Sequence, residues 1–278
     1  MGWRKIFGCL AFAALAFSLY PSGVRAEDST VARPVGLFTT MPIYWGEAEE
    51  LAELLRPEAA SHWVRRTLEE RHGIVFPLDV LDPEAEELAE LQYLLMAQPR
   101  ALAPAENVAV DDWVRDGGHL LMFVDPWLEE PSRFALGDPR RSYPAALVSP
   151  ILAHWGLRLE FDDQQGEGIR QVPVNGQSVS VEMAGRLSAI GQPAPASADC
   201  AIQAEGLIAQ CRIGGGSALV VADAALLRAD MEQPAASQSL KALLDQAFPL
   251  GDSRGKARGI APAVEVFAES QVKIDKIP

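Results

Sequence analysis

The chain has 278 residues and a formal net charge of −14, with 24 basic against 38 acidic residues. Nucleic-acid binding requires a basic surface that neutralises phosphates, so this balance argues against a nucleic-acid partner. Hydrophobic residues make up 49% of the chain, which is enough to bury a substantial core. These totals favour a globular protein of one large or two small domains.

Residues 1–26 have the pattern of a targeting segment. Arg4 and Lys5 precede an apolar run over residues 6–19, which is short for a membrane span. Residues 24–26 offer a signal-peptidase cleavage site. We predict a signal peptide and export to a bacterial periplasm. The alternative is an uncleaved inner-membrane anchor, which would be the protein's only contact with the membrane.

A strand is predicted over residues 35–38, and Pro42 prevents a regular helix in the loop that follows it. The loop carries hydroxyl groups and aromatic rings suited to a small polar ligand or a protein partner. Its candidate ligand-binding residues are Thr39, Thr40, Tyr44 and Trp45. The alternative interpretation is that the aromatic rings pack onto the core.

The next segment alternates between helix and strand. Helices are predicted over residues 47–55 and 59–72, and Gly73 ends the second of them. A strand over residues 75–78 and an acidic helical turn within 83–91 follow. This order of elements is typical of a doubly wound α/β domain.

A strand–helix–strand unit over residues 91–126 is the centre of the predicted fold. The apolar run over 91–97 is typical of a strand buried on both faces. Pro104 can open the helix, Gly117 and Gly118 end it, and a second buried strand follows over residues 120–124. Such a crossover is right-handed and makes its two strands parallel.

Polar side chains follow both of these strands. Gln98 leaves the first strand at its carboxyl end, and Asp125 leaves the second. Ligands bind at this edge in open α/β sheets, so Gln98 and Asp125 are candidate ligand-binding residues.

A long irregular loop over residues 126–144 carries three more candidates, Arg133, Arg140 and Arg141. Arginines beside a strand edge can hold a carboxylate, a phosphate or an acidic sugar. The alternative is that they pair with nearby acidic residues, namely Asp138, Glu129 and Glu130. A short helix over 149–155 and a strand over 157–161 follow.

Residues 162–216 are predicted to be an antiparallel extension at the edge of the sheet. Polar alternation before and after Asn175-Gly176 is a strong signal for a hairpin. If Glu205-Gly206 is the centre of a second two-residue turn, paired residue numbers sum to 411. Cys200 and Cys211 also sum to 411, so they lie opposite each other within disulfide reach. Export favours a structural disulfide, and the alternative is two buried free thiols.

The chain then returns to the main sheet. We predict a parallel strand over residues 218–222 that ends in Asp223, and helices over 224–229 and 237–248. Residues 251–278 are predicted to be a linker-like tail. The whole domain is therefore predicted over residues 27–250, between a signal peptide and the tail.

Few signatures of catalysis are present. The chain has no G-x-S-x-G elbow, no Walker loop and no dinucleotide-binding glycine motif, so we expect no cofactor. Its four histidines are scattered singly, without the spacing of metal ligands, so we expect no metal. Asp125 and Asp223 both end strands and could form the carboxylate pair of a hydrolase. The alternative is that both carboxylates cap helices.

Several short motifs resemble the auxiliary domain of uncharacterised ABC-type transport systems, which include gliding-motility transporter accessory proteins. They are a P-x-x-L-x-P-x-E pattern, a glycine pair, an Asp-Pro pair and a glycine-led apolar strand, which match Pro99, Leu102, Pro104, Glu106, Gly117, Gly118, Asp125, Pro126 and residues 214–223. The resemblance implies a flavodoxin-like fold of the class I glutamine-amidotransferase type, which also occurs in an intraflagellar-transport protein. Met96, Ala97 and Gln98 stand where the enzymes of that fold carry a catalytic cysteine, so the resemblance implies that amidotransferase activity is lost.

These observations favour a non-enzymatic exported domain that binds a small polar ligand or a protein partner beside an ABC-type transporter or in the cell envelope. Two alternatives remain open. One is an exported hydrolase that uses the strand-end carboxylates, and the other is a purely structural envelope protein.

Overall fold

The computed structural model describes residues 33–47, 61–82, 86–191 and 198–249, all within one unit that spans Ala32–Pro278. The predicted signal segment, nearly all of the predicted helix over 47–55 and the predicted tail lie outside the described residues. No helix in the described part of the chain is both long and apolar enough to cross a lipid bilayer.

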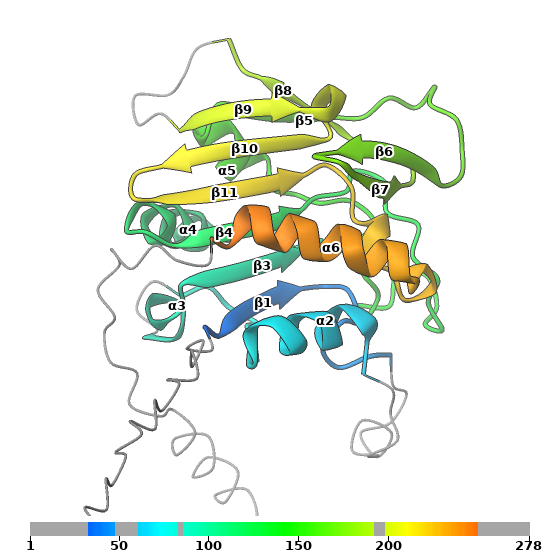
Figure 1. Ribbon diagram of the computed structural model, residues 1–278, viewed down its shortest axis with the longest axis horizontal. Helices are drawn as coiled ribbons and strands as arrows, with labels where there is room; N and C mark the ends of the chain where they lie inside the picture. Colours follow the sequence, from blue (N-terminus) through cyan, green and yellow to red (C-terminus); the bar gives the residue numbers. More distant parts are fainter. Residues whose placement is uncertain (1–32, 48–60, 83–85, 192–197, 250–278) are drawn as a thin grey trace, which may run out of the picture. The chain divides into compact units, whose positions relative to one another are not determined.

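A seven-stranded sheet lies at the centre of the fold (Figure 1). Its strand order is β2-β1-β3-β4-β11-β10-β9, and the first five strands are mutually parallel. Strand β10 runs antiparallel to β11, and β9 runs antiparallel to β10. The predicted mostly parallel sheet with an antiparallel extension is thereby confirmed. The strands are β1 (Val35–Thr39), β2 (Val75–Pro77), β3 (Tyr93–Ala97), β4 (His119–Phe123), β9 (Asp199–Gln203), β10 (Ile208–Ile213) and β11 (Gly216–Val221).

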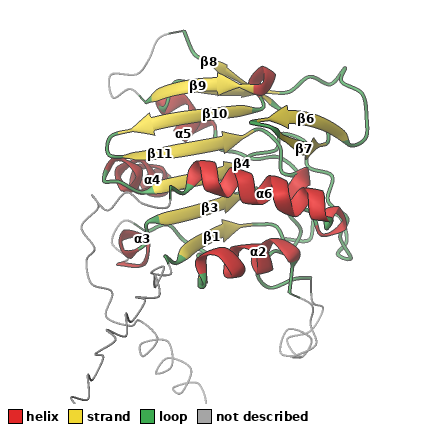
Figure 2. Ribbon diagram, viewed as in Figure 1, coloured by secondary structure: helices red, strands yellow, loops and turns green. Residues whose placement is uncertain are grey.

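Helices cover both faces of the sheet, as a doubly wound fold requires (Figure 2). Successive side chains of a strand point to opposite faces, so Tyr93 and Leu95 of β3 pack on one side while Leu94 and Met96 pack on the other. Helices α2 and α6 bury their apolar stripes on the first face, and α3, α4 and α5 cover the second. The helices are α2 (Trp63–His72), α3 (Glu86–Glu90), α4 (Pro104–Arg115), α5 (Ser149–His154) and α6 (Pro234–Ala247).

Helix α4 begins and ends where the sequence predicts. Pro104 occupies its first turn, and the Glu106 carboxylate accepts a hydrogen bond from the backbone N–H of Ala103 at 2.7 Å. At the other end Gly117 has φ 112°, a left-handed conformation that glycine adopts without strain. A Cβ atom on Gly118 would overlap the indole ring of Trp113, so the second glycine is required by packing.

The hairpin predicted at Asn175-Gly176 is confirmed, but its predicted place at the edge of the sheet is wrong. Strands β6 (Arg170–Val174) and β7 (Gln177–Val181) pair only with each other, and both turn residues have positive φ. Val174, Val179 and Val181 are buried in the cluster that contains α6. The hairpin lies over this helix because its apolar face needs cover that the sheet edge cannot give.

The second of the two small sheets also departs from the prediction. Strand β5 (Leu157–Glu160) pairs antiparallel with β8 (Arg186–Ala189) and stays separate from the central sheet. Only β9 and β10 extend that sheet. The helix predicted over 224–229 is instead two 3₁₀ turns, η2 (Ala225–Leu227) and η3 (Ala229–Met231). The last helix begins at Pro234, three residues before the predicted start, because proline is favoured in a first helical turn.

The register predicted for the β9–β10 hairpin is confirmed. The backbone N–H of Leu207 bonds to the carbonyl of Ala204 at 3.0 Å, which closes the turn around Glu205-Gly206 in the 3₁₀ turn η1 (Ala204–Gly206). Cys200 therefore faces Cys211, with 4.0 Å between their Cα atoms, and the two form a disulfide. The disulfide ties the outer strand β9 to its neighbour.

Candidate functional site

Four parallel strands end at one edge of the sheet and bring their following residues together. Thr39 ends β1, Gln98 follows β3, and Asp125 and Asp223 follow β4 and β11 by two residues. The long loop over residues 126–148 begins at this edge and returns to it, since the N–H of Ala146 bonds to the carbonyl of Asp125 at 2.8 Å. The candidate site is built on this edge.

Gln98 joins the strand ends to the loop. It is fully buried and takes a left-handed conformation with φ 44°, so the chain turns sharply after β3. Its amide nitrogen donates to the carbonyls of Asp125 and Tyr143 at 3.0 and 2.9 Å, and its amide oxygen accepts from the N–H of Asp125 at 2.8 Å. Gln98 therefore lies beneath the surface, where it holds the loop in place.

The predicted loop after β1 contributes support and one exposed ring. The hydroxyl of Thr39 donates to the carbonyl of Ala97 at 2.8 Å, and that of Thr40 donates to the carbonyl of Gln98 at 2.5 Å. The guanidinium of Arg65 lies over the ring of Tyr44, and its central carbon is 4.1 Å from the ring centroid. Trp45 meets the edge of Tyr44 and is 62% exposed, so it is free to contact a partner or ligand.

The three candidate arginines do not converge on one point. Arg140 forms an ion pair with Asp138 at 2.7 Å and lies over the ring of Phe134. Arg141 donates to the carbonyl of Phe134 at 2.6 Å, and the backbone N–H of Arg133 bonds to Glu47. Pairing with an acidic neighbour, the alternative interpretation of the sequence, holds for Arg140.

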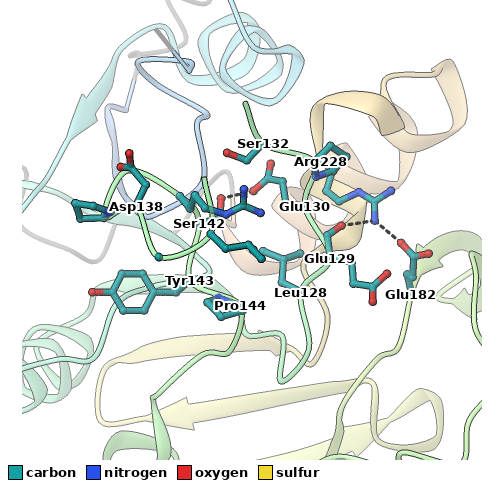
Figure 3. A pocket seen from close by; sticks show the side chains of 15 residues that line it. Leu128, Glu129, Glu130, Ser132, Asp138, Ser142, Tyr143, Pro144, Glu182 and Arg228 are labelled. Carbon is teal, nitrogen blue, oxygen red and sulfur yellow. Dashed lines mark hydrogen bonds and ion pairs between the residues drawn. The ribbon is translucent and has the colours of Figure 1, made fainter. Parts of the chain in front are cut away.

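A cleft of about 790 Å³ is formed by the loop together with Glu182 and Arg228 (Figure 3). Its lining combines apolar side chains with carboxylates and two arginines. Of the nine candidate residues from the sequence, Arg141 lines it, while Thr40 supports it through a 3.2 Å bond from the N–H of Tyr143. The lining residues are Leu128, Glu129, Glu130, Pro131, Ser132, Leu136, Gly137, Asp138, Pro139, Arg141, Ser142, Tyr143, Pro144, Glu182 and Arg228.

Arg228 is the most heavily bonded side chain of the cleft. Its guanidinium binds Asp230 through two nitrogens at 3.0 and 2.8 Å, and it also donates to Glu182 and to the carbonyl of Glu129. Figure 3 shows it between Glu129 and Glu182. Sequence reasoning missed this residue, although a single arginine within the apolar stretch 222–229 is a signal for a buried, paired cation.

Glu130 has an unusual environment. Burial raises the pKa of its carboxyl to about 7, against the stabilising hydrogen bond from the Ser142 hydroxyl, and the charge of Glu47 contributes to the rise. The Ser142 hydroxyl is a neutral hydrogen-bond donor to Glu130, and Glu129 is exposed. Both carboxyl groups can therefore accept further hydrogen bonds from a ligand. Within the described residues no group of three or more metal-binding side chains is placed to hold an ion.

Asp125 and Asp223 form a buried pair beneath the cleft. Each is 1% exposed. The carboxylate of Asp125 accepts from the N–H groups of Trp127 at 2.7 Å and Ala224 at 3.2 Å. That of Asp223 accepts from Ala225 at 2.8 Å and Glu182 at 2.9 Å. All four oxygens therefore accept hydrogen bonds from backbone N–H groups. The helix capping weighed from the sequence is not found, because no helix begins at Trp127 and the N-cap of η2 is Ala224, without a side-chain cap bond.

Comparison with known proteins identifies no family for this chain. No family model matches the chain, and no curated protein matches it. Among solved structures, the mmIFT52 N-terminal domain is similar at 11% identity and TM-score 0.46, over 77% of this chain and 96% of that one. A putative ThuA-like protein from Bacteroides uniformis has 13% identity and TM-score 0.38, over 83% and 94%.

A third similar structure belongs to a larger protein. The exo-beta-1,4-mannosidase Op5Man5 from Opitutaceae bacterium strain TAV5 has 14% identity and TM-score 0.38, over 78% of this chain. This chain spans only 34% of the mannosidase. Similarity at these levels says nothing about the activity of the present protein.

Proposed function

We propose that the protein is a non-enzymatic binding domain and that the cleft formed by the loop, Glu182 and Arg228 takes a small polar ligand. The observation that supports this most is the cleft itself, because its volume suits a small molecule and the loop that forms it is anchored at the edge where α/β sheets bind ligands. Its size and mixed lining favour a binding role over a purely structural one.

The chemistry of the lining indicates the kind of ligand. Glu129 and Glu130 offer carboxylate acceptors, while Leu128, Tyr143 and Pro144 offer apolar surface. The guanidinium of Arg228 is already bonded to groups of the protein, so an anionic ligand gains little from it. A ligand that donates hydrogen bonds from hydroxyl or ammonium groups and has one apolar face, such as a sugar, fits this lining best.

The hydrolase alternative finds less support. A catalytic carboxylate must reach its substrate, whereas Asp125 and Asp223 are each 1% exposed and bond to backbone N–H groups through every oxygen. We therefore assign these carboxylates to the architecture of the site.

We also propose that the domain works outside the cytoplasm, in association with an ABC-type transport system or another envelope protein. The sequence pattern of residues 1–26 supports export, and the disulfide between Cys200 and Cys211 is of a kind that persists in oxidising compartments. The motifs that resemble the transport auxiliary domain support the partner. Co-purification from membranes with a tagged chain would identify it.

A thermal-shift screen of residues 27–278 against sugars, amines, amino acids and nucleotides tests the binding role. A ligand that binds only the folded state must raise the melting temperature. We expect a hit that is lost in Glu130→Gln and retained in the control Glu167→Gln, which alters an exposed carboxylate on another loop. A hit that survives Glu130→Gln and is lost in Trp45→Ala would move the site to the β1 loop.

A further inference from the structure

The two buried carboxylates lie on neighbouring strands at the same height. Val221 of β11 pairs with Phe123 of β4, so Asp223 and Asp125, each two residues further on, leave the sheet side by side. Asp125 also accepts the N–H of Ala224, the residue next to Asp223. Two like charges held this close in a site that excludes water cannot both ionise freely.

The charged groups around the pair do not neutralise it by contact. Arg228 faces it from the 3₁₀ turns, but its hydrogen bonds go to Asp230, Glu182 and the carbonyl of Glu129. Arg170 of β6 lies near Asp223 at longer range, and Glu182 adds negative charge beside Asp125. The two carboxylates therefore lower their combined negative charge by binding a proton, and not by pairing with a cation.

A chain of contacts runs from this pair to the cleft. The carboxylate of Asp223 holds the backbone N–H of Glu182, and the side chain of Glu182 holds Arg228. Arg228 in turn bonds to the carbonyl of Glu129, and all three of these residues line the cleft. These bonds connect the pair to the cleft wall.

We propose that Asp125 and Asp223 share one proton and act as a positioning pair, which fixes the Glu182–Arg228 wall of the cleft while the proton is held and loosens it when the proton leaves to solvent. This role rests on the proposed function, because it concerns the same cleft. The geometry is supported by the electrostatics. Burial raises the pKa of Asp125 to about 7 and raises that of Asp223 well above its usual range, and the charge of Asp125 raises it further.

The backbone N–H groups that bind the pair provide a test that needs no ligand. In the ¹⁵N-labelled chain from Glu27 onward, which contains the whole unit Ala32–Pro278, the amides of Trp127, Ala224, Ala225 and Glu182 can be followed against pH. We expect all four to titrate together at one shared midpoint, well above the ordinary range of a carboxyl group. The Nε signal of Arg228 should move at the same midpoint, which a merely structural pair would not cause.

Substitutions separate sharing from simple burial. In Asp125→Asn the Glu182 and Ala225 amides should titrate about 2 pH units lower, since Asp223 no longer faces a like charge. Asp223→Asn should do the same at Trp127. The control is Asp162→Asn, because Asp162 caps Gln164 in the same way, 2.9 Å from its N–H, but is exposed. It should leave all four midpoints unchanged.

Two results would overturn the proposal. One is the absence of any shared step above pH 5 in the unsubstituted protein, which decides the question even if the variants do not fold. The other is an unchanged midpoint at Glu182 in Asp125→Asn. A failed ligand screen would leave both measurements readable, so the proposed function and the shared proton can fail separately.

Discussion

At the scale of single residues, Gln98 shows how a position suited to function can instead serve the fold. It stands at the sharp turn after β3, where the resemblance stated from the sequence predicts a lost nucleophile. Its side chain satisfies three backbone groups, the N–H and carbonyl of Asp125 and the carbonyl of Tyr143. The loop that forms the cleft depends on these bonds.

Gln98→Met tests this dependence. Methionine fills a similar volume but leaves the N–H of Asp125 and the carbonyl of Tyr143 without the partner that Gln98 supplies, and each unsatisfied group costs about 1–3 kcal/mol. We expect the free energy of unfolding to fall by about 3 kcal/mol in denaturant titrations. The control Gln164→Met alters an exposed glutamine and should change little. Equal stability of both variants would mean that Gln98 does not hold the loop.

For Glu130 we expect a substitution to increase the free energy of unfolding, whereas Gln98→Met should lower it. Its folded pKa of about 7 lies above the ordinary 4.5, so its contribution to stability is full below pH 4.5 and is lost as pH rises through 7. Glu130→Gln removes the buried charge. The variant should gain about 2 kcal/mol over the unsubstituted protein at pH 8 and gain nothing at pH 4. An equal loss of stability at both pH values would contradict the raised pKa of Glu130.

At the scale of elements, features set by neighbouring residues could be predicted from the sequence. Pro104, Gly117 and Gly118 mark the ends of α4, and the arithmetic of the turn at Glu205-Gly206 gives the register of β9 against β10. Each of these depends on a few consecutive residues. The parallel pairing of β3 with β4 was predicted from the right-handed crossover between them and is confirmed.

The remaining features depend on contacts between distant parts of the chain. The β6–β7 hairpin lies over α6 because Val174 and Val179 are covered there, and no local pattern contains that information. The ion pair of Arg228 with Glu182 joins residues 46 positions apart. Of the candidate ligand-binding residues from the sequence, Arg141 lines the cleft, and that this cleft binds a ligand stays a prediction.

The disulfide gives a prediction at this scale. It closes a loop with a sequence separation of 11 residues, so its removal should cost about 2 kcal/mol through the entropy of the unfolded chain. We expect the double variant Cys200→Ser, Cys211→Ser to unfold at lower denaturant concentration than the oxidised protein. Reduction of the unsubstituted protein should produce the same shift and should not affect the double variant. A double variant of unchanged stability would show that the hairpin does not need the bridge.

At the scale of the whole molecule, a doubly wound sheet places one polar edge beneath a long loop, and this loop forms the cleft together with Glu182 and Arg228. The buried carboxylates and Gln98 secure the base of the site, while Glu129 and Glu130 remain available in the lining. The acidic balance of the chain agrees with a ligand that donates hydrogen bonds and disfavours a nucleic-acid partner.

The measurement that tests this account most directly is an amide chemical-shift map of the labelled protein with the best ligand from the screen. The account predicts that the perturbed amides cluster at Glu129, Glu130, Ser142, Glu182 and Arg228, around the cleft. Perturbations confined to the groove between the β6–β7 hairpin and α6, around Asn175 and Gln246, would contradict it.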